Sequence, residues 1–303
     1  MRHFLISKLL ISLFVLDALP VTSAEEELSM SNGEYVVPGI LSLPAQTNHA
    51  APAVLLLHGT ASQKNEVGDL YLQLAQKLAA EGIASLRIDL AGAGDSAVDH
   101  LHFSLSSATR DAQTAFDFLS THPLINNKKI AVLGFSQGGL IAQRLVLKEP
   151  RALALATWST AAANGRGSFA RFFDEHYREA LRTGHASVAF PWLSEPLRFS
   201  LQWFTEIDEQ QTLTEMQGYK APILCIAGTA DSTVAFEQSE ELINVSTHPM
   251  SQLVLLAGAD HIFNVLAAKP SFKETPTHSD RLLSTTVSWL SELFDHYSQS
   301  AGP

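Results

Sequence analysis

IAVLGFSQG, residues 130–138, joins an apolar run of strand length to the pattern G-x-S-x-G. From about Gln137 to Pro150 the apolar residues recur with the spacing of an amphipathic helix, so the serine lies between a strand and a helix. A turn this tight strains the backbone of the serine, and the flanking glycines remove side chains that would collide there. The pattern predicts that Ser136 presents its hydroxyl as a nucleophile above the carboxyl edge of a sheet. A purely structural turn is the alternative.

Further apolar runs of strand length alternate with helical patterns on both sides of this segment. The strand-like runs cover residues 53–57, 84–88, 130–133, 153–157, 223–227 and 253–256. Amphipathic patterns indicate helices near residues 66–81, 108–123, 137–150 and 282–293. Runs that are apolar throughout fit strands covered on both faces, so we expect an α/β fold with a mostly parallel, doubly wound sheet. Residues 35–43, interrupted at Pro38-Gly39, predict an antiparallel edge pair before it.

The regular alternation stops between residues 158 and 218. Residues 158–204 hold 10 of the chain's 25 aromatic residues, which sets this stretch apart from the rest. They are Trp158, Phe169, Phe172, Phe173, Tyr177, Phe190, Trp192, Phe199, Trp203 and Phe204. We expect a mostly helical insertion, broken at Gly184, Pro191 and Pro196. It is either a subdomain that packs its own core or a lid whose apolar underside roofs a pocket. Residues 25–157 and 219–303 then form the α/β core.

A serine hydroxyl is a weak nucleophile and needs a base, which in turn needs an orienting acid. For a serine on a strand-to-helix turn of this kind, the acid and then the histidine follow along the chain. Asp231 comes directly after the strand-like run 223–227, and His261 follows the run 253–256. Both side chains are therefore expected at the same sheet edge as Ser136. In that arrangement Asp231 fixes the imidazole tautomer, and His261 takes the serine proton and later gives it to the leaving group.

A tetrahedral intermediate on Ser136 also requires two hydrogen-bond donors for its oxyanion. The backbone N–H of Gln137 is one candidate, because it opens the helix behind the serine. The second candidate is the backbone N–H of Thr60, in the loop that follows the first buried strand and His58-Gly59. We therefore predict an oxyanion hole formed by Thr60 and Gln137.

Other carboxylates and histidines compete with these assignments. Asp260 adjoins the histidine and is expected to hold a loop, and Asp89 and Asp95 are expected to fix the glycine-rich loop between them. His58 is expected to be structural. His100 and His102 alternate as on a strand and could pair on a metal, but no third ligand accompanies them, so surface histidines are favoured and no metal is predicted.

The N-terminus has the layout of a secretory signal peptide. A positive start with Arg2 and Lys8 precedes a short apolar run, and small residues precede the acidic residues 25–27. We expect cleavage after about Ala24, although Asp17 is unusual there and a buried N-terminal helix is the alternative. The mature product is expected in the periplasm or outside the cell, without a membrane span.

The composition excludes several classes of protein. A net charge of −11 without a basic patch argues against a nucleic-acid partner. Charged residues make up only 17% of the chain and hydrophobic residues 46%, which rules out a disordered chain. The lone cysteine, Cys225, allows neither an intrachain disulfide nor a cysteine-based zinc site.

With these motifs in order, the sequence resembles the α/β-hydrolase superfamily from about Val54 to the C-terminus. The residues that carry the resemblance are His58-Gly59, Asp89 with Gly92-x-Gly94-Asp95-Ser96, Gly134-x-Ser136-x-Gly138, Gly228-x-x-Asp231 and Asp260-His261. Their order and loop lengths are similar to those of the feruloyl/cinnamoyl esterase and monoglyceride lipase branch. That resemblance implies an α/β-hydrolase fold and an oxyanion hole at Thr60 and Gln137. One departure is the loop at residues 91–94, which reads Ala-Gly-Ala-Gly where the branch has Arg-Gly-His-Gly.

These patterns predict an exported serine hydrolase that cleaves carboxylic esters of small molecules and needs no cofactor. The aromatic-rich insertion suggests an apolar or aromatic group in the substrate. An exported peptidase or amidase with the same three residues is the first alternative. It would need a carboxylate to hold a substrate amine, for which the insertion offers Glu175, Glu179, Glu195 and Glu206. A non-catalytic binding protein of the same fold is the second alternative.

Overall fold

The computed structural model describes residues 24–45, 49–267 and 276–299. The predicted signal peptide, residues 1–24, lies outside these ranges except for Ala24, and it stays a prediction. Within the described ranges, every helix is too short or too polar to cross a bilayer.

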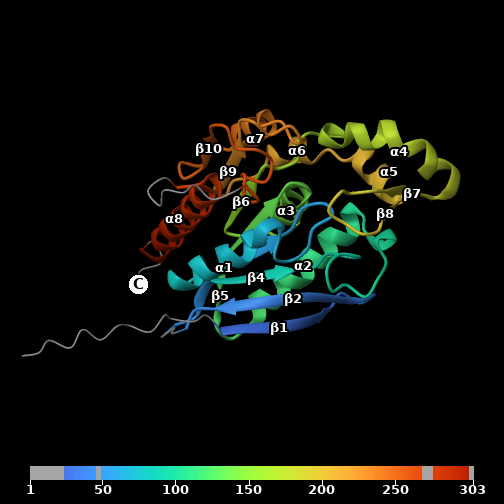
Figure 1. The fold of residues 1–303 in the computed structure, drawn as a ribbon. Coiled ribbons are helices and arrows are strands. Elements are labelled where there is room, and N and C mark those ends of the chain that lie inside the picture. Colours follow the sequence, from blue (N-terminus) through green and yellow to red (C-terminus); the bar gives the residue numbers. More distant parts are fainter. Residues whose placement is uncertain (1–23, 46–48, 268–275, 300–303) are drawn as a thin grey trace, which may run out of the picture.

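Among the described residues, eight strands form one sheet in the order β1-β2-β4-β3-β5-β6-β9-β10 (Figure 1). They are β1 (Ala24–Ser31), β2 (Val36–Leu43), β3 (Ala51–Leu57), β4 (Ala84–Ile88), β5 (Ile125–Phe135), β6 (Ala154–Trp158), β9 (Ile223–Gly228) and β10 (Gln252–Leu256). β1 and β2 run antiparallel at one edge of this sheet. The other six strands, β4, β3, β5, β6, β9 and β10, are parallel to one another. The predicted mostly parallel sheet is confirmed.

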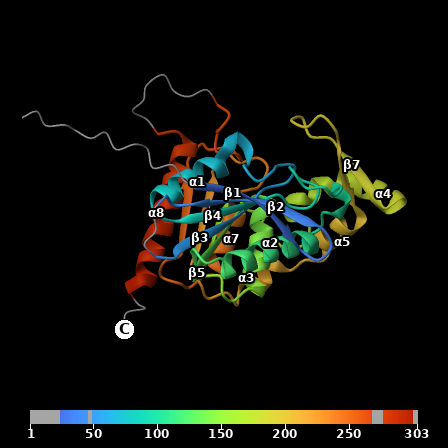
Figure 2. The same ribbon diagram turned by 90° about the horizontal axis from the view of Figure 1, so that it is seen from below.

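Helices cover both faces of this sheet (Figure 2). They are α1 (Leu70–Ala80), α2 (Leu105–Thr121), α3 (Gln137–Lys148), α7 (Glu237–Asn244) and α8 (His278–Gln299). Along β3, Leu55 and Leu57 pack on the side of α2, α3 and α7, whereas Val54 and Leu56 pack on the side of α1 and α8. Successive residues of a strand point to opposite faces, so a strand buried on both sides has to be apolar throughout.

The segment between β6 and β9 contains three α-helices and a small hairpin within the described chain. Its elements are α4 (Ala170–Thr183), β7 (His185–Val188), β8 (Leu197–Ser200), α5 (Leu201–Glu209) and α6 (Thr212–Met216). Figures 1 and 2 show α4, α5 and the hairpin at the end of the molecule opposite α8. The hairpin is a departure from the expected mostly helical insertion: α4 ends at Gly184, which has a left-handed backbone, and β7 and β8 follow it, with Pro191 and Pro196 in the connection between these two strands.

The aromatic residues of this segment pack mainly on one another. The ring centroids of Phe199 and Trp203 lie 4.8 Å apart, and those of Trp203 and Phe204 lie 4.9 Å apart. All three side chains are fully buried and belong to the same apolar cluster as α2 and α3. Much of the aromatic enrichment therefore forms a core that continues the core of the sheet.

Three further elements differ from the sequence expectation. Strand β1 covers residues 24–31, where no strand was expected. Its acidic residues are exposed at the edge of the sheet, so its sequence contains no apolar run. The expected antiparallel pair within residues 35–43 is wrong, because Val36–Leu43 form one strand, β2, which continues through Pro38 and Gly39 and pairs with β1. Helix α7 was not predicted, since it buries only Ser239 and Leu242 and shows little apolar periodicity.

Candidate active site

Ser136 occupies a strained turn between β5 and α3. Its backbone has φ 55° and ψ −121°, a region that non-glycine residues rarely adopt. The turn lies against neighbouring backbone: a methyl group on Gly134 would lie 2.1 Å from the carbonyl oxygen of Gly138, and one on Gly138 would lie 2.1 Å from that of Leu57. Both glycines of the G-x-S-x-G pattern are therefore required by close approach of the chain.

The structure brings Ser136, His261 and Asp231 together from three strand ends. Nε2 of His261 lies 3.0 Å from Oγ of Ser136, and its Nδ1 lies 2.8 Å from Oδ2 of Asp231. A carboxylate only accepts, so Nδ1 carries the hydrogen and Nε2 is left to accept the hydroxyl of Ser136. Ser136 follows β5, Asp231 follows β9 and His261 follows β10, so parallel strands deliver all three to one sheet edge.

The carboxylate of Asp231 is held from both oxygens. Its side chain is fully buried, and Oδ1 accepts hydrogen bonds from the backbone N–H groups of Thr233 and Val234, each at 2.8 Å. Oδ2 is thereby aimed at His261. The ring of His261 also packs against Phe135, with centroids 5.0 Å apart, which further restricts its orientation.

Asp260, the neighbouring carboxylate, has a different role. Its Oδ1 accepts hydrogen bonds from the backbone N–H groups of Ile262 and Asn264, at 3.1 and 2.7 Å. It closes the turn that carries His261 and does not contact the imidazole. The structure therefore pairs His261 with Asp231.

Thr60 and Gln137 lie side by side next to the serine. Oγ1 of Thr60 donates to Oε1 of Gln137 at 2.7 Å, which joins the loop after β3 to the start of α3. Among the described residues, the backbone N–H groups of Thr60 and Gln137 have no hydrogen-bond acceptor, so both are available to a bound oxyanion. The arrangement is consistent with the oxyanion hole expected from the sequence.

The loop that carries Thr60 is held by Glu66, a residue that the sequence did not single out. Its buried carboxylate accepts the backbone N–H of Gly59 at 2.8 Å and the hydroxyl of Ser62 at 2.6 Å. Glu66 itself has φ 62° and ψ 169°, a strained conformation for a residue with a side chain. A lone glutamate in a polar loop carries no sequence signal for such a role.

A buried ion pair fixes the next loop. Nζ of Lys64 contacts both Asp89 and Asp95 at 2.6 Å, and Asp89 also accepts the backbone N–H groups of Lys64 and Asp95. Burial alone would lower the pKa of Lys64, but its hydrogen bonds to the two carboxylates outweigh this and raise that pKa. Asp89 and Asp95 thus hold the loop 90–95 and lie apart from Asp231.

The histidines near this edge have separate environments. His58 links two loops: its Nδ1 lies 2.8 Å from the carbonyl oxygen of Gly59, and its Nε2 accepts the backbone N–H of Leu90. His100 is buried and stacks on Phe103, whereas His102 is exposed. Within the part of the chain that the structure describes, no group of three or more metal-ligating side chains occurs.

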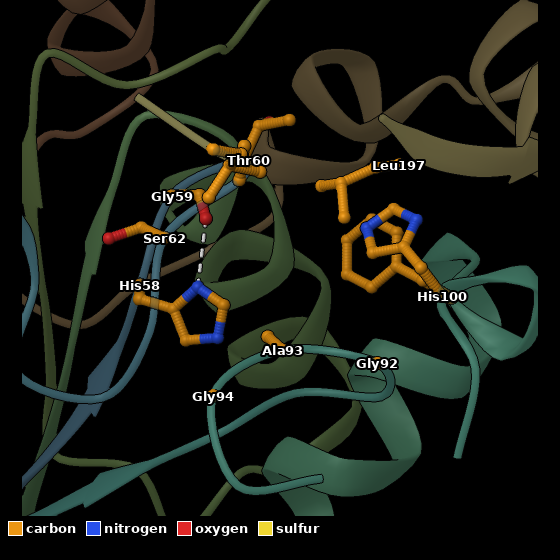
Figure 3. Close-up of a pocket in the computed structure, with 12 residues that line it drawn as sticks. His58, Gly59, Thr60, Ser62, Gly92, Ala93, Gly94, His100 and Leu197 are labelled. Atoms are coloured by element: carbon orange, nitrogen blue, oxygen red, sulfur yellow. Dashed lines mark hydrogen bonds between the residues drawn. The ribbon is translucent and has the colours of Figure 1, made fainter. Parts of the chain in front are cut away.

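A cavity of about 180 Å³ adjoins the loop of Thr60 (Figure 3). It is lined by His58, Gly59, Thr60, Ala61, Ser62, Gly92, Ala93, Gly94, His100, Phe103, Leu193 and Leu197. Gly59 connects the cavity to the nucleophile, because a methyl group built on it would lie 3.2 Å from Cβ of Ser136. Leu193 and Leu197 belong to the insertion, so that segment forms part of the cavity wall.

Comparison with known proteins places the chain in a family. Residues 48–205, just over half of the chain, match the model of the Hydrolase_4 family, described as serine aminopeptidase, S33. An uncharacterised protein of Mycobacterium tuberculosis is 27% identical over 219 residues, which is 72% of this chain. The match spans 66% of that relative, less than two thirds of its length.

Solved structures share the fold at low sequence identity. Est1E from Butyrivibrio proteoclasticus superposes with a TM-score of 0.67 at 16% identity, covering 89% of this chain and 99% of that one. A monoacylglycerol lipase from Paleococcus ferrophilus gives a TM-score of 0.60 at 20% identity, covering 81% and 97%. These structures confirm the α/β-hydrolase fold, and the match to the Hydrolase_4 family model confirms the predicted resemblance to this superfamily.

Proposed function

The chain belongs to the Hydrolase_4 family of α/β hydrolases, and from this premise we propose that it is an exported serine hydrolase that cleaves carboxylic esters through an acyl-enzyme. Ser136 is the proposed nucleophile, His261 the base and Asp231 the orienting acid. The observation that carries the proposal is the continuous hydrogen-bonded series from Asp231 through His261 to Ser136, at 2.8 and 3.0 Å.

The proposed reaction proceeds in two halves. Oγ of Ser136 attacks the ester carbonyl carbon while Nε2 of His261 takes the hydroxyl proton. The bond from the carbonyl carbon to the alcohol oxygen then breaks, and His261 gives its proton to the leaving alcohol. Water attacks the acyl-enzyme by the same route, which releases a carboxylic acid and restores Ser136. These steps use side chains of this chain and the backbone N–H groups of Thr60 and Gln137, which stabilise the oxyanion.

The preference for esters is supported by the chemistry of the cavity. A peptidase that acts on a free amino terminus needs a carboxylate to hold the ammonium group, and none of the described residues that line this cavity carries one. Among the candidate carboxylates of the insertion, Glu206 accepts hydrogen bonds from Ser106 and Gln202, and Glu175 pairs with Arg171. Among the structural neighbours, one structure carries ferulic acid bound to Est1E and another is a monoacylglycerol lipase.

An aminopeptidase or amidase is the second candidate function, because the matching family model is described as serine aminopeptidase. A series of p-nitrophenyl esters beside aminoacyl p-nitroanilides separates the two. The proposal expects kcat/KM for the best ester to exceed that for any anilide by at least about 10³-fold. Faster turnover of an aminoacyl anilide would replace the ester assignment with the peptidase.

Export is proposed from residues 1–24, whose charge order and apolar run are those of a signal peptide. Expression of the full chain in a bacterial host followed by N-terminal sequencing of the periplasmic product tests it. The proposal expects a mature chain that begins at Glu25 or within a few residues of it. An uncleaved chain found only in the cytoplasm would contradict export.

A further inference from the structure

The cavity beside Thr60 has an uncharged lining. Five of its twelve lining residues have apolar side chains and three are glycines, and among the described residues no lysine, arginine, aspartate or glutamate contributes to it. Pockets for drug-sized ligands span roughly 300–1,000 Å³, so a cavity of about 180 Å³ is suited to a smaller group. Burying an unpaired charge there would be costly, and a neutral, compact ligand is the class that fits.

His100 provides one polar atom in this cavity that the protein does not use. Oγ1 of Thr60 donates to Gln137, the hydroxyl of Ser62 donates to Glu66, and both ring nitrogens of His58 contact backbone groups. Nδ1 of His100 lies 3.1 Å from the carbonyl oxygen of Arg198. Among the residues that the structure describes, Nε2 of His100 has no hydrogen-bond partner. Figure 3 shows the His100 ring beside Leu197, across the cavity from Thr60.

The free ring nitrogen is an acceptor. A carbonyl oxygen only accepts, so Nδ1 of His100 carries the hydrogen and Nε2 presents its lone pair. Burial lowers the pKa of His100 to about 4, and the ring is therefore neutral near pH 7. A ligand group that donates a hydrogen bond matches this nitrogen, whereas an anion or a second acceptor does not.

The strand order indicates which part of an ester reaches the cavity. At the carboxyl edge of the sheet, the cavity lies at the loops after β4 and β3, and Ser136 follows the next strand, β5. His261 follows β10, so it approaches Ser136 from the side of β5 that is opposite the cavity. The leaving alcohol has to approach His261 to receive its proton. The group that extends from the carbonyl carbon in the opposite direction, toward Thr60, is the acyl group.

We propose that the cavity is an acyl subsite for a short, uncharged acyl group that carries a hydroxyl, and that Nε2 of His100 accepts the hydrogen bond from that hydroxyl. Hydroxyphenyl-alkanoyl and ω-hydroxyalkanoyl groups are the matching classes. This inference rests on the proposed ester hydrolysis, whose substrate class it specifies. His100 is then a specificity-determining residue.

Matched esters test the assignment. kcat/KM is measured for p-nitrophenyl 3-(4-hydroxyphenyl)propanoate and p-nitrophenyl 3-phenylpropanoate, and for 6-hydroxyhexanoate and hexanoate esters of the same alcohol. The proteins are the full mature chain, His100→Phe, His100→Gln and His102→Phe. Phenylalanine keeps an aromatic ring for the stack on Phe103, glutamine keeps an acceptor, and His102 is an exposed histidine outside the cavity wall.

The readout is the ratio of hydroxylated to plain ester within each protein, so any general loss of folding or activity cancels. In at least one of the two ester pairs, we expect a ratio of about ten in the parent chain and in His102→Phe. The ratio should fall to near one in His100→Phe and should lie between these two values in His100→Gln. Equal ratios in the parent chain and His100→Phe would overturn the inference. 4-Hydroxybenzyl acetate and benzyl acetate form a further pair, in which the hydroxyl lies on the alcohol and not on the acyl group. If His100→Phe changes the ratio for this pair alone, the acyl assignment is overturned.

A binding measurement separates this inference from the proposed function. Titration with p-cresol and with toluene, followed by the ¹⁵N shift of Nε2 of His100, requires no turnover. We expect p-cresol to bind at least about fivefold more tightly than toluene and to shift that nitrogen. A chain that hydrolyses no ester but binds p-cresol in this way refutes the proposed function while supporting the hydroxyl site. A chain that hydrolyses esters without a preference for p-cresol keeps the function and overturns the site.

Discussion

The indole Nε1 of Trp192 donates a hydrogen bond to the backbone carbonyl of Ala61 at 2.9 Å. Trp192 belongs to the connection between β7 and β8, and Ala61 follows the proposed oxyanion donor Thr60. The indole is 65% exposed, so this bond is a surface attachment and not part of the aromatic core. It joins the insertion directly to the loop beside the nucleophile.

Replacing Trp192 with phenylalanine should weaken substrate binding. The ring is kept and the N–H donor is lost, which loosens the cavity wall formed by Leu193 and Leu197. We expect KM for esters to rise about threefold to tenfold, with a smaller change in kcat, because one hydrogen bond contributes ~0.5–1.5 kcal/mol. Leu181→Ala, an exposed residue of α4 outside the cavity wall, serves as the control. An unchanged KM in the Trp192 variant would show that the attachment does not shape the binding site.

Replacing Glu66 with glutamine should lower kcat more than it raises KM. A glutamine amide has one accepting oxygen, whereas both carboxylate oxygens of Glu66 accept hydrogen bonds from the loop that carries Thr60. Misplacing one oxyanion donor should cost about tenfold to a hundredfold in kcat. Steady-state kinetics on one ester measures the split. Glu81→Gln, at the exposed end of α1, is the matched control, and equal kinetics for the two variants would refute a positioning role for Glu66.

Replacing Gly138 with alanine should destabilise the fold. The added methyl group would lie 2.1 Å from the carbonyl oxygen of Leu57, so the β5–α3 turn has to shift. We expect the free energy of unfolding to fall by about 3 kcal/mol or more. Gly33→Ala is the comparison: Gly33 has φ 91° but open space around it, and its substitution should cost only ~1–2 kcal/mol. Urea denaturation measures both, and equal losses would contradict the close-approach argument.

Lowering the pH should destabilise the protein through His100. Its folded pKa is about 4 because burial disfavours the charged ring, while its ordinary pKa is 6.5. Between these values the unfolded chain binds more protons than the folded chain, so stability is full above pH 6.5 and falls as the pH falls toward 4. At ~1.36 kcal/mol per pKa unit, this contribution is on the order of 3 kcal/mol.

Urea denaturation at intervals from pH 7.5 to 4 measures this pH dependence. His100→Phe should show a smaller loss of unfolding free energy over that range, whatever its stability at pH 7.5. Parallel curves for the variant and the parent chain would show that His100 does not titrate with a lowered pKa.

The parallel sheet was predictable from the sequence because its strands are covered on both faces. Leu55 and Leu56 belong to opposite cores, so the run that contains them has to be continuously apolar. Edge strand β1 lacks this constraint, and its exposed acidic residues leave no pattern. The hairpin β7–β8 was hidden for a related reason, since each of its strands has only four residues.

The convergence of Ser136, Asp231 and His261 was also predictable, because parallel strands bring their carboxyl ends to one edge. The supporting residues were not. Glu66 acts through its carboxylate on the backbone N–H of Gly59, and Lys64 is paired with Asp89 from 25 residues away. Contacts of this kind depend on loop conformations, such as the positive φ of Glu66, that local sequence does not determine.

The most direct test of the account is active-site labelling with a fluorophosphonate, located by peptide mass spectrometry. The hydrogen bonds from Asp231 through His261 to Ser136 predict one adduct per chain, on Ser136. Labelling should be at least about 10³-fold slower in His261→Ala and absent in Ser136→Ala. A folded parent chain that forms no adduct, or that labels at the same rate without His261, would contradict the proposed activation of Ser136.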